Sequence, residues 1–226
     1  ESLADWQSYA FRQGRSIFDA HCYIQRNFSG ERAPRFAVRA DVRKCYDTIS
    51  HNWLIRNIPI DKKVLEETLG AGSIYGSELF PPLEYGISQG ASLSPILGNM
   101  TLDGLQAAVF DRLYGDSRID YGDGSMVRFA DDIIFSARSR ESAEIIMEAI
   151  QEFLAVRGLE LNWSKSYIVD MEEGFEFLSR WYQRKFHGSL LVCEPSERAV
   201  DNFQARLQRY IANFKGSQVK LIDGLN

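Results

Sequence analysis

The stretch that decides the fold is Arg128-Phe129-Ala130-Asp131-Asp132-Ile133-Ile134-Phe135-Ser136-Ala137. Two adjacent carboxylates separate two short runs of β-branched and aromatic residues, which is typical of two strands joined by a tight turn. Two ionised carboxylates side by side repel each other, and partial burial increases the repulsion. A divalent cation such as Mg²⁺ or Mn²⁺, which prefers hard oxygen ligands, would relieve it. A solvated Asp-Asp turn is the alternative, because Asp is a common turn residue.

A second strand that ends in a carboxylate is expected over residues 36–42, where the side chains alternate and Asp41 lies near the end. The expected elements then run strand, helix, helix, strand, strand, helix, strand. This order favours an α+β fold in which an antiparallel sheet has helices packed on one face. If the two carboxylate-bearing strands are neighbours, Asp41 and Asp131 come together.

The remaining pattern predicts further helices from apolar periodicity and capping residues. These helices are expected over 3–27 with a break before Ser16, over 51–58, over 62–69, over 94–113 as one long helix begun by Ser94 and Pro95, over 141–157, and over 197–215. Further strands are expected from alternating or β-branched runs. These are 83–87 as a hairpin arm, 167–169, and 175–178 paired with 190–192.

Composition bounds the class of protein. The chain has 226 residues, of which 45% are hydrophobic, enough for one large domain or for one domain with an appendage. No apolar run approaches the roughly 20 residues of a membrane span. The three cysteines form no C-x-x-C pair and have no metal-type spacing with the three histidines. A zinc site is therefore not favoured, and reduced thiols in a cytosolic (cytoplasmic) protein are the expectation.

Charge is distributed unevenly along the chain, although the net charge is −5. Residues 1–56 hold nine Lys and Arg against six Asp and Glu, residues 57–135 hold five against twelve, and residues 177–226 hold eight against four. Basic ends around an acidic middle fit a metal site between polyanion-binding surfaces, and they equally fit ordinary solvated faces. The chain begins at Glu1 rather than Met, so we expect a piece of a longer or processed protein.

Several motifs, in their order and spacing, resemble those of the reverse transcriptases, most closely the group II intron-like ones. They are Phe11-Arg12-Gln13-Gly14-Arg15-Ser16, Asp41-Val42-Arg43-Lys44-Cys45-Tyr46-Asp47, Gly86-Ile87-Ser88-Gln89-Gly90 with Ser94-Pro95, Phe129-Ala130-Asp131-Asp132, Gly158-Leu159 with Lys165, and Phe175-Glu176-Phe177-Leu178-Ser179. The resemblance implies a polymerase palm. Its expected parts are partial fingers at 1–35, a palm at 36–193 with an insertion around 50–85, and the first thumb helix and a tail at 194–226.

The resemblance also implies roles for individual residues in nucleotide addition with Mg²⁺, or alternatively Mn²⁺. The expected metal ligands are Asp41, the carbonyl of Val42 and Asp131, while Asp132 is expected either to bind the metal more weakly or to stand just behind its direct ligands. Lys165 would protonate the leaving pyrophosphate, and Tyr46 would exclude a 2′-hydroxyl. The alternatives without a catalytic role are that Lys165 is a solvated surface lysine and that Tyr46 is a core aromatic. The expected contacts to nucleotide are Gln89 and Gly90, and those to nucleic acid are Arg12, Arg15 and Phe129.

The implied partners are an RNA template and primer, dNTPs and structured intron RNA, with no membrane and with a homodimer compatible with the sequence. Two departures from the family pattern stand out: Phe129 where Tyr is usual, and Tyr46 where Phe is commoner. The family's upstream fingers segment, with its basic triphosphate-binding residues, does not precede Glu1 in this sequence. The alternatives to an intron-type enzyme are a CRISPR-associated or retron-type reverse transcriptase and an RNA-binding splicing cofactor whose polymerase site is idle. All three carboxylates are present, which favours an active polymerase over an idle one.

Overall fold

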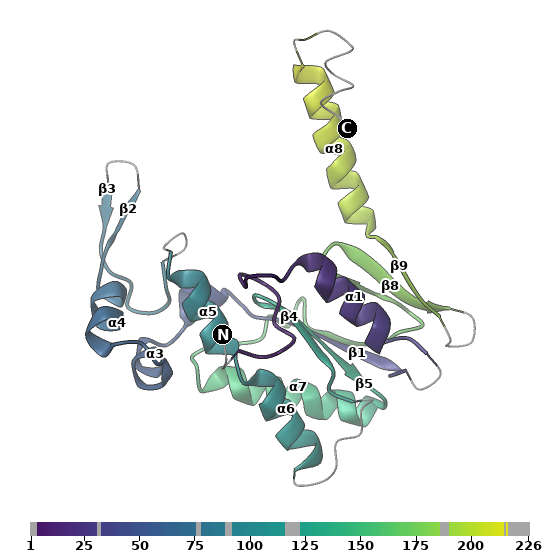
Figure 1. Ribbon diagram of the computed structural model, residues 1–226, viewed down its shortest axis with the longest axis horizontal. Helices are drawn as coiled ribbons and strands as arrows, with labels where there is room; N and C mark the ends of the chain where they lie inside the picture. Colours follow the sequence, from purple (N-terminus) through teal and green to yellow (C-terminus); the bar gives the residue numbers. More distant parts are fainter. Residues whose placement is uncertain are drawn as a thin grey trace.

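A four-stranded antiparallel sheet forms the centre of the molecule (Figure 1). The computed structural model describes residues 4–30, 33–75, 78–88, 92–115, 123–185, 190–214 and 216. In spatial order the strands are β4 (Met126–Phe129), β5 (Asp132–Ala137), β1 (Phe36–Asp41) and β6 (Tyr167–Asp170).

The register of this sheet confirms that the two carboxylate-bearing strands are neighbours. β1 pairs with β5 so that Asp41 lies opposite Asp132. β4 pairs with β5 so that Phe129 also lies opposite Asp132, which leaves Ala130 and Asp131 as a two-residue loop. The Asp pair therefore straddles the end of a hairpin, with Asp131 in the loop and Asp132 at the start of a strand.

Helices complete the fold. Five of them begin with a capping side chain that accepts a hydrogen bond from a backbone N–H, as Ser and Asp favour: these caps are Ser16, Ser50, Asp61, Ser139 and Ser196. The helices are α1 (Ile17–Asn27), α2 (Cys45–Thr48), α3 (His51–Asn57), α4 (Lys62–Leu69), α5 (Ser94–Leu102), α6 (Leu105–Tyr114), α7 (Arg140–Ala155) and α8 (Glu197–Asn213).

The central sheet is covered on both faces, whereas the sequence predicted helices on one face only. Val38, Ala40 and Phe135 belong to the larger core, which α7 and the helices beside it complete. The alternate residues Ala37 and Ile134 belong to a second core. α1 and a second sheet close that face (Figure 1). Strands with two buried faces carry apolar residues at consecutive positions, so the one-sided expectation was wrong.

The second sheet has the order β7 (Phe175–Phe177), β8 (Arg180–Lys185) and β9 (Leu190–Pro195). The predicted pairing of 175–178 with 190–192 is wrong, because β8 lies between them. The polar composition of β8 hid it. Its inward residues are Tyr182 and Arg184. Arg184 is buried, and its guanidinium donates to the Phe28 carbonyl at 2.9 Å.

The predicted long helix over 94–113 is two helices, α5 and α6, which break at Asp103 and Gly104. Gly104 has a φ of 89°, outside the helical region. Its N–H donates to the Asp5 carboxylate, and Asp103 pairs with Arg128, so tertiary contacts fix the break. Ser94 is the first residue of α5 rather than its cap, and its hydroxyl donates to the Ser88 carbonyl at 2.6 Å.

The hairpin expected at 83–87 lies earlier in the chain, as β2 (Ser73–Tyr75) and β3 (Glu78–Phe80). Residues 83–88 are irregular and are held against α2 by hydrogen bonds from Gly86 N to Ile49 O and from Ile87 N to Tyr46 O. Gly86 has a φ of 80°, and an added Cβ would lie 2.5 Å from the Tyr46 carbonyl oxygen. Only glycine fits this close approach.

The N-terminal segment is helical only from Ile17 onward, so the first half of the predicted helix over 3–27 is wrong. Ser8 instead forms a parallel bridge with Arg128 of β4. Backbone bonds of 2.9 Å join Arg128 N to Gln7 O and Tyr9 N to Arg128 O. This segment therefore covers the free edge of the hairpin that carries the Asp pair.

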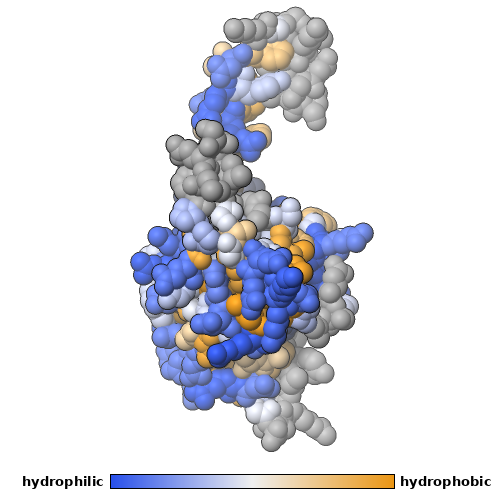
Figure 2. All heavy atoms as spheres, turned by 90° about the vertical axis from the view of Figure 1, so that its left-hand side faces the viewer, coloured by the Kyte–Doolittle hydropathy of each residue, from blue (hydrophilic) through white to orange (hydrophobic). Residues whose placement is uncertain are grey.

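Helix α8 projects from the body in both views (Figures 1 and 2). Among its described residues none is buried, and Phe203 is 65% exposed. Figure 2 shows the side that carries α3 and α4 as mostly hydrophilic, with separate hydrophobic spots. No helix in the described part of the chain is long and apolar enough to cross a membrane.

Candidate active site

Asp41 is held at the end of β1 by the segment that follows α7. Its carboxylate accepts a hydrogen bond of 2.9 Å from the Asn162 amide and pairs with Lys165 Nζ at 3.4 Å. The Asp41 backbone is also fixed, since Asn162 N donates to its carbonyl and its own N–H donates to Ser166 Oγ. Asp41 is 7% exposed. A carboxylate with this many partners has a defined position before any ligand arrives.

The loop of the β4–β5 hairpin sets Asp131 beyond the end of the sheet. Ala130 adopts a φ of 56°, a left-handed conformation that costs a residue with a Cβ about 1–2 kcal/mol. Strain of this kind is common where a functional side chain is aimed. Asp132 begins the next strand, and its carboxylate pairs with Arg39 Nη2 at 2.8 Å.

The electrostatics of Asp131 favour the binding of a cation. Burial raises the pKa of Asp131, and the neighbouring charges of Asp132 and Asp41 raise this pKa further, while Lys165 lowers it. Clustered carboxylates that repel each other suit a divalent ion with hard oxygen ligands. Among the described residues, no three His, Cys, Asp or Glu side chains are already arranged to hold a metal. Lys165 and Arg39 instead neutralise two of the three carboxylates. The donors therefore fit a metal in chemical type, and two cationic side chains lie beside them.

Val42 and Tyr46 both lie next to these carboxylates. Val42 is buried and forms a bridge with Leu161. The Tyr46 ring packs on the larger core and lies 3.1–3.2 Å from the position of a Cβ added at Gly98 of α5. The pKa of Tyr46 is raised by burial, then by Cys45 and Asp131. Burial, with Asp131 and Asp41, raises the pKa of the Cys45 thiol to about 12, which keeps it neutral at neutral pH.

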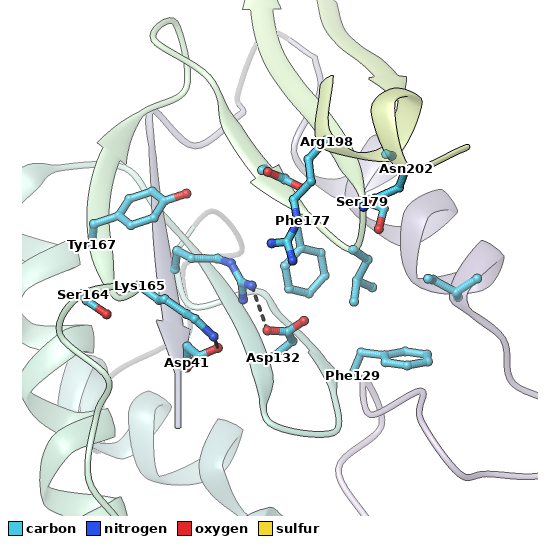
Figure 3. Close-up of a pocket in the computed structure, with 15 residues that line it drawn as sticks. Asp41, Phe129, Asp132, Ser164, Lys165, Tyr167, Phe177, Ser179, Arg198 and Asn202 are labelled. Atoms are coloured by element: carbon cyan, nitrogen blue, oxygen red, sulfur yellow. Dashed lines mark hydrogen bonds and ion pairs between the residues drawn. The ribbon is translucent and has the colours of Figure 1, made fainter. Parts of the chain in front are cut away.

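A cleft of about 610 Å³ opens beside the carboxylates. Figure 3 shows Asp41 and Lys165 on one side, Asp132 at the centre, and Arg198 and Asn202 of α8 on the other side. Phe129 also borders it. The cleft thus joins the end of the central sheet to the second sheet and to the first turns of α8. Its lining holds three basic and three acidic side chains, which suits a polyanion bound together with a cation.

The predicted nucleic-acid contacts Arg12 and Arg15 lie outside any helix and serve the chain itself. Arg12 Nη1 donates to the carbonyls of Asp5 at 2.8 Å and Ser8 at 3.1 Å. Arg15 donates to the Trp6 carbonyl and stacks on the Trp6 ring at 5.3 Å. These contacts brace the N-terminal segment, and contact with RNA stays a prediction. Gln89 and Gly90 lie outside the described residues.

Three residues of the site were missed by sequence reasoning: Arg39, Asn162 and Ser166. Arg39 carried a signal, since it lies two residues before Asp41 on an alternating strand and therefore shares its face. Asn162 and Ser166 carried a weaker one, because they flank Lys165 but contact Asp41 only through the tertiary fold.

Comparison with known proteins gives one family and several relatives. Residues 2–181 match the family model described as reverse transcriptase (RNA-dependent DNA polymerase). The chain is 28% identical to Protein YkfC of Escherichia coli over 88% of this chain and 62% of that protein. It is also 28% identical to the putative COX1/OXI3 intron 2 protein of Saccharomyces cerevisiae, over 62% of this chain and 23% of that protein.

A solved structure shares the fold. Telomerase from Candida albicans, in complex with a TWJ fragment of telomeric RNA, matches with a TM-score of 0.55 and 14% identity. The match covers 92% of this chain and 39% of the telomerase chain. The chain thus spans less than two thirds of each protein reported.

Proposed function

Since this chain belongs to the reverse transcriptase family, we propose that it is the palm of an RNA-directed DNA polymerase. Residues 1–35 would belong to its fingers, 36–193 to the palm and 194–226 to the start of its thumb. The observation that carries the proposal is the register that brings Asp41, Asp131 and Asp132 to one end of a sheet, beside an open cleft.

The proposed reaction joins a primer 3′-hydroxyl to the α-phosphate of a dNTP. The hydroxyl gives up its proton to solvent and its oxygen forms a new bond to the α-phosphorus. The bond between the α-phosphorus and the oxygen that bridges to the β-phosphate breaks, and pyrophosphate leaves. Divalent metal ions, with Mg²⁺ as our choice and Mn²⁺ as a substitute, supply charge stabilisation for the attacking and leaving oxygens. Asp41, Asp131 and the Val42 carbonyl would hold them, and Asp132 would either bind more weakly or stand just behind these ligands.

Other side chains act on the substrates themselves. Lys165 reaches the carboxylates from the cleft wall and is 64% exposed, so it is free to meet a leaving pyrophosphate and give it a proton. Tyr46 would bar a 2′-hydroxyl by its ring, which Gly98 lets lie close against α5. Phe129 would pack beside the primer end.

The proposed polymer substrate is RNA paired with a DNA primer. Lys165 and Arg198 line the cleft and are both exposed, which supports binding of a phosphate backbone beside the acidic side chains of the same lining. The telomerase neighbour is described in complex with an RNA fragment, which is a property of that protein and supports RNA here by likeness of fold alone. We propose a group II intron-like element as the source, with a role in splicing of its RNA, because the yeast relative is an intron protein.

The test is primer extension by the longer natural protein on RNA and DNA templates, with dNTPs and separately with rNTPs. The proposal predicts extension on RNA with dNTPs in Mg²⁺, and much less with rNTPs. Extension with rNTPs alone would make it an RNA-copying polymerase. RNA binding without any extension would support the idle splicing cofactor instead.

A further inference from the structure

Arg39 is bound more firmly than a surface arginine would be. Its side chain is 13% exposed, and Nη2 lies 2.8 Å from Asp132 Oδ1. Nη1 lies 3.4 Å from the carbonyl oxygens of Ala40 and of Ile133. The guanidinium therefore contacts both strands that end at the carboxylates, and its planar fork is fixed from more than one direction.

The same guanidinium also reaches the second sheet. Its central carbon lies 4.9 Å from the centroid of the Phe177 ring on β7. Phe177 is fully buried and belongs to the core beneath the cleft. An arginine over an aromatic face in a partly desolvated place gains attraction from the ring. Arg39 thus connects Asp132 to the β7–β8 hairpin across the cleft floor.

Lys165, the other cation at the site, is held differently. Its side chain is 64% exposed and makes one contact, 3.4 Å long, with Asp41. An arriving cation displaces such a lysine at small cost, because the ammonium group returns to water. Displacing Arg39 would leave a nearly buried guanidinium without its carboxylate, which is far more costly.

We propose that Arg39 is a positioning residue that withholds Asp132 from the metal ion and locks this carboxylate to the β7–β8 hairpin. The proposal rests on the function proposed above. On this account Asp41 and Asp131 are the metal-binding carboxylates. Asp132 instead fixes, through Arg39 and Phe177, the strand hairpin that lines the cleft. The sequence-based role of Asp132 as a weak ligand would then follow from its partner rather than from its distance along the chain.

A neutral residue at position 39 should therefore release Asp132 to the metal. The site would gain one ionised oxygen ligand and lose one positive charge, and both changes strengthen cation binding. We expect Arg39→Gln to bind Mn²⁺ about tenfold more tightly, since the number of charged ligands tunes cation affinity over such ranges. Removing Asp132 as well should cancel the gain.

The experiment is a Mn²⁺ titration of the 226-residue chain without nucleic acid, with free Mn²⁺ followed by electron paramagnetic resonance. Asp132→Asn should keep affinity within about twofold of the starting protein, because Asp132 is not a metal ligand there. The Arg39→Gln, Asp132→Asn double variant should match it, because it removes one charge of each sign and adds no ligand. Asp170→Asn is the matched control, since Asp170 pairs with Arg35 in the same sheet away from the cleft.

Two results would overturn the proposal: unchanged or weaker binding in Arg39→Gln, or a loss in Asp132→Asn as large as that in Asp41→Asn. Should Arg39→Gln fail to fold, Phe177→Leu serves instead. It removes only the ring under the guanidinium, so Arg39 should hold Asp132 less firmly. Asp132 would then reach the metal part of the time, and Mn²⁺ binding should tighten by about threefold. No tightening there would also refute the link. Failure of the proposed function looks different: Asp41→Asn and Asp131→Asn would then leave Mn²⁺ binding intact.

Discussion

The buried ion pair behind the catalytic hairpin gives a stability prediction that can be worked from the structure. Arg128 lies on β4, three residues before Asp131, with no exposed side-chain area, and it pairs with Asp103, whose side chain is 13% exposed. Burial lowers the pKa of Arg128 and raises the pKa of Asp103, and each partner's charge opposes the shift of the other. The pair is thus costly to bury but more costly to break.

Asp103→Ala leaves a buried guanidinium without its carboxylate. Breaking a buried pair costs about 3–5 kcal/mol, and we expect the low end, about 3 kcal/mol, because Asn99 Oδ1 remains near Arg128. The remaining contact is 3.2 Å long. For a chain of this size that loss lowers the melting temperature by about 6–12 °C.

Urea unfolding followed by circular dichroism measures this loss, with Glu144→Ala as the control. Glu144 pairs with Arg140 at 3.0 Å, but both side chains are more than half exposed. An exposed pair of this kind contributes about 0.5 kcal/mol or less. Equal, small losses in the two variants would refute the reasoning that burial makes the Arg128 pair matter.

Three further predictions follow from other contacts. Tyr46→Val should raise the use of rNTPs relative to dNTPs about tenfold or more, since it opens space beside the 2′ position. Competitive single-nucleotide incorporation measures this ratio, and an unchanged ratio would mean that Tyr46 is a core aromatic. Gly86→Ala should lower the free energy of unfolding by about 2 kcal/mol or more, because Gly86 has a positive φ and an added Cβ would clash. Gly30 has a positive φ but open space around it, so Gly30→Ala should lose less stability in the same urea titration. Burial and then Arg180 lower the pKa of His21, which bonds the Tyr182 hydroxyl. The folded state therefore favours neutral His21. The stability that this gives is present above the ordinary histidine pKa of about 6.5 and is lost as the pH falls below it. The free energy of unfolding should therefore change less between pH 7.5 and pH 5 in His21→Gln than in the unaltered protein.

Elements that depend on local sequence pattern were predicted correctly. The hairpin around Asp131 and the helices begun by Ser50, Asp61 and Ser196 follow from alternation and capping. The break at Gly104 was missed, because the apolar periodicity continues through it and the contacts of Asp5 and Arg128 that fix it come from distant parts of the chain.

The same limit applies at the site. Asp41 and the Asp pair carry strong local signals, whereas Asn162 is distinguished only by the bond that it makes across the fold. Arg12 and Arg15 show the converse. Their motif suggested phosphate contacts, which stay a prediction, and it gave no sign of the bonds that both make to carbonyls of their own segment. Side chains that serve tertiary contacts leave little trace in a single sequence.

The most direct test of the account compares two carboxylates of the same sheet in the longer natural protein. Single-turnover primer extension on an RNA template with dNTPs and Mg²⁺ would be measured for Asp131→Asn and for Asp170→Asn. Asp131 stands in the loop between two carboxylate neighbours, and Asp170 pairs with Arg35 on β6. The account predicts that Asp131→Asn slows extension by about a thousandfold or more, as expected for the loss of several kcal/mol of charge stabilisation, while Asp170→Asn extends at nearly the original rate. Extension by Asp131→Asn at a rate close to that of the unaltered protein would contradict it.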